Sequence, residues 1–321
     1  MLRIILVLIV AITLLAFFLL VYYRETTPAG KELEEVLEEI KKQGIKPVPR
    51  SKIPLKGKAF WVWGTTVREY GVDHVIEKAL SVGAKHIFLL VRGTSGEVVK
   101  EVIKELLPKA HEKGMYVHAW IVCFSSESPE SYVYRKYLLK VILEFLLLNS
   151  SGHFVDGIHL DYIRYGGFAR EKWQYVSSFV KEVRILIDTV APNTVLSIAS
   201  KAENYNSKQD LLDSALFYGQ NYTDLAKYVD LFCPMTYYLD YNVPPEAIGP
   251  AIKWIKEVTG KSVFAGVQIY PGPNYREPTP DEIKRCIKAA IENGADGVIF
   301  FRLGAVLDDW NKYSDALKYS P

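Results

Sequence analysis

The stretch 155–165 carries the residues best suited to chemistry. It reads Val-Asp-Gly-Ile-His-Leu-Asp-Tyr-Ile-Arg-Tyr, which places His159 and Asp161 two positions apart. In a β-strand, side chains at this spacing lie on the same face. A carboxylate beside an imidazole at a strand end can act as nucleophile or charge stabiliser with a hydrogen-bonding companion. The alternative is a structural role, in which Asp161 forms a buried ion pair with Arg164 or Arg92.

This strand belongs to a repeating pattern in which apolar, β-rich runs alternate with amphipathic helical stretches. Strands are predicted at 59–66, 86–92, 116–124, 155–165, 195–201, 229–238, 263–270 and 297–303. Helices are predicted near 73–82, 97–113, 129–148, 170–189, 208–227, 245–258, 280–293 and 308–318. Repeated strand–helix units give parallel strands, and eight of them in one domain of about this length predict a single (β/α)8 TIM barrel of class α/β.

Active sites of such barrels lie at the carboxyl ends of the strands. Polar and aromatic residues gather at these ends, and together they predict a cavity that suits the faces and hydroxyl groups of sugars. The expected substrate-binding residues are Trp63, Arg92, His118, Trp120, His159, Tyr237, Gln268, Tyr270 and Arg302. Of these, His159 is expected either to orient Asp161 or to bind a hydroxyl group.

Composition excludes several other classes of function. The net charge is +2, and the 39 basic and 37 acidic residues are interspersed, so no nucleic-acid partner is expected. No Gly-rich dinucleotide motif or P-loop follows a strand, so no cofactor is expected. The three cysteines lack metal spacing and argue against a disulfide framework. A zinc site built on His118 and His159 would need a third ligand that the sequence does not identify, so no metal is predicted.

The amino-terminal segment predicts a membrane anchor. Residues 4–23 are apolar except for Thr13, long enough to cross a bilayer of about 30 Å. A long, cleaved signal peptide is the alternative. The predicted organisation is an anchor at 1–24, a stalk or linker with a short helix at 25–58, and a catalytic barrel at 59–321. Lysines and arginines lie on both sides of the anchor, so their distribution does not predict its orientation. We expect a single-pass protein with an extracytoplasmic barrel, because a short amino-terminal tail, an anchor and a large domain are a common export arrangement.

The strand at 155–165 resembles the signature of the glycosyl-hydrolase-like 10 family, a family of glycosidase-like barrels. Further matches lie at Trp61, at 90–92 and at 117–120. The resemblance implies glycoside hydrolysis with Asp161 at the catalytic position. More distantly, the chain resembles chitinase-type barrels, but Ile163 stands where their glutamate acid would fall. It also resembles amylase-type barrels, in which the acid is a glutamate on the fifth strand.

The amylase comparison makes Glu203 the first candidate for the general acid, and Asp240, after the sixth strand, is its rival. With Asp161 as nucleophile or stabiliser, the expected enzyme is a glycosidase acting on a polysaccharide or glycoconjugate at the cell surface. A separation between the carboxyl groups of about 5 to 5.5 Å would predict retention, and one of about 6.5 to 9.5 Å inversion. The alternatives are a non-catalytic carbohydrate-binding barrel and a metal-dependent polysaccharide deacetylase. The sequence does not predict the oligomeric state.

Overall fold

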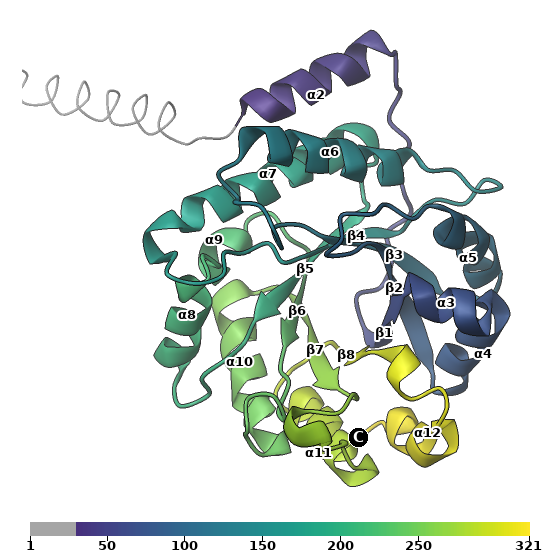
Figure 1. The fold of residues 1–321 in the computed structure, drawn as a ribbon, viewed down its shortest axis with the longest axis vertical. Helices are drawn as coiled ribbons and strands as arrows, with labels where there is room; N and C mark the ends of the chain where they lie inside the picture. The colour runs from purple at the N-terminus through teal and green to yellow at the C-terminus, as the bar shows by residue number, and fades with distance from the viewer. Residues whose placement is uncertain (1–29) are drawn as a thin grey trace, which may run out of the picture.

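Each strand has two apolar faces, one turned to the interior of a barrel and the other to the helices around it. In the computed structural model, which describes residues 30–321, strands pair in the order β1 to β8 and β8 pairs with β1, all in parallel (Figure 1). The strands are Gly57–Trp63 (β1), Ala84–Arg92 (β2), Tyr116–Val122 (β3), Gly157–Asp161 (β4), Val195–Lys201 (β5), Leu231–Met235 (β6), Ser262–Gln268 (β7) and Gly297–Phe301 (β8). The predicted closed barrel is therefore confirmed.

The helices surround the barrel, as Figure 1 shows. They are Lys31–Lys42 (α2), Gly64–Tyr70 (α3), Val72–Ser81 (α4), Glu101–Glu112 (α5), Tyr132–Leu147 (α6), Trp173–Val190 (α7), Lys208–Phe217 (α8), Tyr222–Leu225 (α9), Ile248–Thr259 (α10), Pro280–Glu292 (α11) and Trp310–Lys318 (α12). The helix predicted at 208–227 is two helices, because the chain turns through Gly219, whose φ is 79°. This turn returns the chain to the carboxyl end of β5.

Two apolar clusters hold the fold together. Residues such as Phe60, Val62 and Leu89 pack between the strands and the outer helices. Their neighbours along the same strands, including Trp61 and Phe88, point into the barrel and pack against one another. The two-residue period of a strand explains this division, and it places His159 and Asp161 on the inner face, as predicted.

Aspartates at the amino ends of three strands brace the preceding strand. The Asp156 carboxylate accepts a hydrogen bond from the Val117 amide at 2.7 Å, and Asp296 accepts one from the Val263 amide at 2.8 Å. Asp230 does the same for Leu196 at 2.8 Å. Asp156 therefore has a structural role at the end of the barrel opposite to Asp161.

The region predicted as a stalk packs on the barrel from residue 31 onward. Helix α2 lies against α6 and α7 (Figure 1), and its own residues Leu33, Val36 and Ile40 are buried in that contact. Residues 48 and 50 then bond through their amides to backbone carbonyl groups just after α7. The apolar stripe of α2 explains the difference, because a helix with such a stripe gains free energy by covering it.

The predicted membrane anchor cannot be compared with the structure, because residues 1–29 lie outside the described part of the chain. Within residues 30–321, none of the helices combines the length and apolar character that a bilayer crossing requires.

Candidate active site

Asp161 ends β4 at the carboxyl mouth of the barrel, with 7% of its surface exposed. Its two oxygens accept hydrogen bonds from different donors: the Trp120 indole N–H at 3.1 Å and the Tyr162 amide at 2.6 Å. Tyr162 has a φ of 51°, which ends the strand five residues after it began. The left-handed turn thus fixes the carboxyl group at the strand end, although the sequence predicted a longer strand.

Burial dominates the electrostatics of Asp161. Removal from water raises its pKa, while the Tyr162 amide, the Arg164 charge, the Trp120 indole and the Lys201 charge lower it, and the net direction is upward. The expected structural alternative, an ion pair with Arg164 or Arg92, is absent among the described residues: neither arginine lies within ion-pair distance of Asp161. A carboxyl group in this setting holds its proton to higher pH than a free aspartate does.

Aromatic rings surround Asp161 on the inner face of the barrel. Trp120 and Trp61 have ring centroids 6.3 Å apart, and Phe301 meets each of them edge-on at 6.1 and 5.7 Å. Tyr237 and Tyr270 continue the cluster, with centroids 5.8 Å apart. The predicted aromatic lining is present at the mouth, and Phe301 is a member that the sequence reading did not select.

His159 does not contact Asp161. Its Nε2 accepts from the Trp61 indole N–H at 3.0 Å, and because an indole can only donate, Nδ1 carries the proton and donates to the Ser197 hydroxyl at 2.9 Å. Burial lowers the pKa of His159 to about 3, so the ring is neutral. The expectation that it orients Asp161 or binds a hydroxyl of the substrate is wrong: it is fully buried and holds Trp61 in place.

His118 and Arg92 also lie away from the mouth. The His118 ring is fully buried, stacks on Phe88 at 4.1 Å and fills the space left by Gly157, where a Cβ would lie 2.1 Å from its Nδ1. Arg92 is buried and donates to the Val122 carbonyl and, at 2.7 Å, to the Tyr134 hydroxyl. Neither can contact a substrate, because their polar atoms face neighbouring strands or α6 instead of the mouth.

Asp240 lies at the mouth on the loop after β6. One carboxylate oxygen accepts from the Gln268 amide at 2.9 Å, and the other accepts from the Tyr270 hydroxyl. Gln268 also accepts from the Leu239 amide at 3.1 Å. Gln268 is fully buried, so it positions the Asp240 loop and does not bind substrate directly. Asp240 itself is exposed and has only neutral donors.

Glu203 lies just after β5, the strand between β4 and β6. One oxygen pairs with the Lys201 ammonium and the other accepts from the Tyr218 hydroxyl at 3.1 Å. Glu203 thus has a cationic partner, whereas the two donors to Asp240 are neutral.

Tyr237 connects the two better candidates. Burial raises its pKa, and the negative charges of Asp161 and Asp240 raise it further, which means that both carboxylates lie near this one phenol. Lys201 is near Asp161 and pairs with Glu203. The structure thus brings Asp161, Asp240 and Glu203 to one mouth.

Two arginines complete the mouth. Arg302 stacks on Trp63 at 3.5 Å from its ring centroid, so these two predicted substrate-binding residues lie side by side. Arg164 stacks on Tyr162 at 4.1 Å. The sequence placed Arg164 at a strand end, but only the structure shows that its side chain lies over Tyr162, where its charge lowers the pKa of Asp161.

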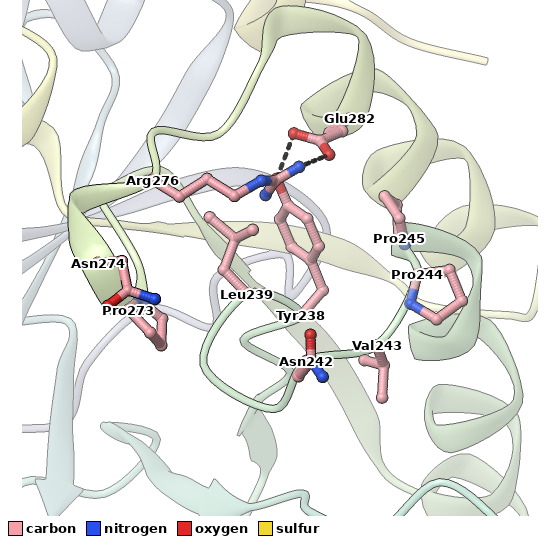
Figure 2. Close-up of a pocket in the computed structure, with 10 residues that line it drawn as sticks. All are labelled: Tyr238, Leu239, Asn242, Val243, Pro244, Pro245, Pro273, Asn274, Arg276 and Glu282. Atoms are coloured by element: carbon pink, nitrogen blue, oxygen red, sulfur yellow. Dashed lines mark hydrogen bonds and ion pairs between the residues drawn. The ribbon is translucent and has the colours of Figure 1, made fainter.

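A hollow of about 650 Å³ lies at the same end of the barrel but outside the aromatic cluster. Figure 2 shows that Arg276 and Glu282 point toward one another across it, next to Tyr238. Glu282 also accepts from the Tyr238 hydroxyl at 3.0 Å and forms the amino-terminal cap of α11 with Thr279. Among the described residues, Glu282 is the one acidic residue that lines the hollow, and its carboxylate is fully engaged in holding the loops together. This hollow is therefore a poorer candidate for catalysis.

Metal ligands do not converge within residues 30–321: no three His, Cys, Asp or Glu side chains are placed to share an ion. Both ring nitrogens of His159 are already hydrogen-bonded. The zinc pair considered from the sequence, His118 and His159, is therefore not assembled as a metal site in this part of the chain.

Comparisons with solved structures place the barrel among known folds. The glycoside hydrolase domain of PgaB (BpsB) from Bordetella bronchiseptica is similar over 84% of this chain and 100% of that domain, with a TM-score of 0.66 and 11% identity. At this identity the likeness shows a shared fold. A chitinase, RmChi1 of Rhizomucor miehei, is similar over 82% of this chain and 99% of that one, with a TM-score of 0.57 and 15% identity. An endo-1,4-β-D-mannanase of Thermotoga petrophila RKU-1 covers 77% and 87%, with a TM-score of 0.57 and 13% identity.

No family model and no curated protein matches the sequence. The resemblance to the glycosyl-hydrolase-like 10 family therefore stays a prediction that rests on the strand-four motif. At 11% to 15% identity, these structures share a fold with this chain. A shared fold does not determine function, which depends on the residues at the mouth of the barrel.

Proposed function

We propose that this protein is a glycoside hydrolase that cleaves a polysaccharide or glycoconjugate at the mouth of the barrel. The observation that carries the proposal is Asp161: a buried carboxyl group with a raised pKa, hydrogen-bonded by Trp120, at the same end of the barrel as Asp240, whose charge acts with that of Asp161 on the Tyr237 phenol. Hydrolysis of a glycosidic bond uses two such groups in different environments. The surrounding indole and phenol rings suit the apolar faces of sugars. The solved structures of similar fold, whose names describe glycoside hydrolases, support the same class.

We assign the proton donor to Asp161 and the ionised role to Asp240. A general acid must hold a proton near neutral pH, and burial favours the protonated form of Asp161. Asp240 is exposed, and its two oxygens accept hydrogen bonds from Gln268 and Tyr270, which hold the side chain in place at the mouth. This division reverses the expectation from the sequence, which made Asp161 the nucleophile or stabiliser and sought the acid in Glu203 or Asp240.

A binding protein without catalysis is the second candidate, because an aromatic mouth also suits carbohydrate recognition alone. The two proposals differ in product formation. The purified protein would be incubated with a panel of neutral, acidic and amino polysaccharides, and new reducing ends would be measured. A hydrolase generates reducing ends from at least one member of the panel. Retention on a polysaccharide gel with no new reducing ends on any member would favour the binding protein.

The raised pKa of Asp161 predicts the pH dependence of the reaction. Because the acid must be protonated, kcat falls as pH rises through this pKa. Arg164 lowers the pKa of Asp161, so Arg164→Gln should move this descending limb to higher pH. Lys78→Gln, which removes a cation stacked on Trp310 outside the mouth, serves as the control and should leave the limb in place. A shift to lower pH in Arg164→Gln would contradict the assignment.

The same group affects stability in a defined direction. Its folded pKa lies above its unfolded value, so the folded protein binds the proton more tightly than the unfolded chain. The free energy of unfolding therefore contains a favourable contribution from Asp161 at low pH that is lost as pH rises through the folded pKa. Asp161→Asn cannot make this contribution. The difference in free energy of unfolding between the wild-type protein and the variant, taken from denaturation curves at several pH values, should therefore change across that range.

We also propose that the protein acts at the cell membrane as a single-pass protein with the barrel on the extracytoplasmic side. The proposal rests on the apolar sequence at 4–23. Fractionation of cells, followed by protease treatment of intact cells, tests it: the barrel should be found with the membrane and should be cleaved from outside. Recovery of the protein in the soluble fraction would refute it.

A further inference from the structure

Two arginines at the mouth lack an acidic partner. Arg164 follows the turn after β4, and Arg302 follows β8, and neither guanidinium group forms an ion pair or hydrogen bond with another residue of the described chain, 30–321. The Nε of Arg164 is buried and unpartnered. Arg184, by contrast, is also partly shielded and pairs with Asp230 at 3.0 Å. Two partly buried cations without partners carry a desolvation cost that a bound anion would offset.

Stacking prepares both guanidinium groups for an anion. Arg164 lies over the Tyr162 ring at 4.1 Å, and Arg302 lies over the Trp63 ring at 3.5 Å. A guanidinium that lies over a ring can still offer its two terminal NH2 groups, and that pair matches the two oxygens of a carboxylate or phosphate. The side chains are already ordered by the rings, so little conformational entropy remains to be lost on binding.

The two groups lie on opposite sides of the mouth. In the closed order β1 to β8, β4 and β8 are separated by three strands in either direction. Asp161, at the end of β4, feels the Arg164 charge. A sugar chain that crosses the mouth from the β4 side to the β8 side would therefore meet one arginine near the proton donor and the other across the opening.

We propose that the substrate is an acidic saccharide whose carboxylate or phosphate groups are bound by Arg164 and Arg302. This inference rests on the proposed hydrolase function and adds a substrate class to it. Lys201 does not take the same role, because its ammonium is neutralised by Glu203. The acidic groups would sit on sugars on both sides of the mouth, which favours a polymer with repeating negative charge over one with a single charged end.

Affinity electrophoresis of the full chain tests the inference. The Asp161→Asn variant would be run in gels that contain polygalacturonate, poly(glycerol phosphate) or neutral dextran, at physiological ionic strength. We expect retardation by the carboxylate polymer, the phosphate polymer or both, and the two gels separate the two sources of charge. Adding Arg164→Gln or Arg302→Gln should raise the dissociation constant about tenfold each, the loss of one charge-assisted contact.

Two further variants separate a specific site from general charge attraction. Lys78→Gln removes the stacked cation over Trp310, 5.2 Å from its centroid, and should leave retardation unchanged. Arg302→Lys keeps the charge but not the planar edge, and it should bind more weakly than the parent. Folding of each variant is checked by its thermal unfolding midpoint.

Equal retardation of the parent and both arginine variants would overturn the inference, as would retardation by dextran alone. These outcomes differ from a failure of the hydrolase proposal. Cleavage of a neutral glycan that is insensitive to Arg164→Gln and Arg302→Gln leaves the hydrolase standing and removes the acidic substrate. Tight binding of an acidic polymer that the wild-type protein never cleaves does the reverse.

Discussion

Asp240→Asn is expected to lower kcat by about 10²- to 10⁴-fold, the usual range for losing a group that acts on the reacting atoms. The substitution removes the negative charge but keeps a side chain of the same shape between Gln268 and Tyr270. Substrate binding should change little, so the loss should appear in kcat instead of KM. The measurement is the initial rate of reducing-end release on the glycan that the panel identifies.

Glu203→Gln is the matched control for this experiment. It removes the same charge from the same mouth, but this carboxylate is already neutralised by Lys201 and bonded by Tyr218. We expect a loss of less than about tenfold, below the range for a catalytic carboxylate. If Glu203→Gln is the more damaging of the two substitutions, the partner of Asp161 is Glu203 and the assignment to Asp240 is wrong.

Arg135→Met is expected to lower the free energy of unfolding by about 3 to 5 kcal/mol, because removing one member of a buried ion pair leaves uncompensated charge. Arg135 is buried and bonds Glu32 of α2 at 2.8 Å and Glu182 of α7 at 2.7 Å. Two carboxylates thus depend on one guanidinium. Even with it present, burial raises the pKa of Glu182 to about 7. Urea denaturation at pH 8 measures the loss.

Lys140→Met provides the comparison for Arg135→Met. Lys140 pairs with Glu39 at 2.8 Å, also between α6 and α2, but both side chains are more than 40% exposed. Exposed pairs contribute about 0 to 1 kcal/mol, so little change is expected. The Arg135→Met deficit should also shrink as pH falls and Glu182 takes up a proton. Equal losses for the two variants would show that the buried triad does not hold α2 on the barrel.

The sequence predicted the barrel well because its signal is local and repeated. Alternating side chains place residues such as Trp61 and Phe88 on the inner face of any strand, and each strand is followed by an amphipathic helix. The ends of elements were less accurate. Strand β4 stops at Asp161 because Tyr162 takes a left-handed conformation, and nothing in the residue type demands that.

The site could be predicted only in part, because a position on the inner face does not fix the level within the barrel. His118 and His159 share the inner face with Trp120 and Asp161, yet they lie deeper, where Phe88 and Trp61 cover them. The number of residues between an inward-facing side chain and the end of its strand decides whether solvent reaches that side chain. Gln268 likewise points inward but bonds the Asp240 loop, a contact between two segments 28 residues apart.

The helix predicted as part of a stalk shows the same limit. The apolar stripe of α2 could be recognised from its sequence, but its partner could not. Glu32 is opposite Arg135 only because α6 follows β3 on the outside of the barrel. Charged residues that look solvated in the sequence are buried by a contact across about a hundred positions.

The most direct test of the account is whether Asp161 supplies the proton to the leaving group. Aryl glycosides of the sugar identified by the panel would be compared in the wild-type protein and in Asp161→Asn, one with a dinitrophenolate leaving group that needs no proton and one with a poor leaving group. We predict that the variant retains most of its kcat on the activated substrate and loses about 10²-fold or more on the poor one. Equal loss on both substrates, or equal activity of variant and wild type, would contradict the assignment.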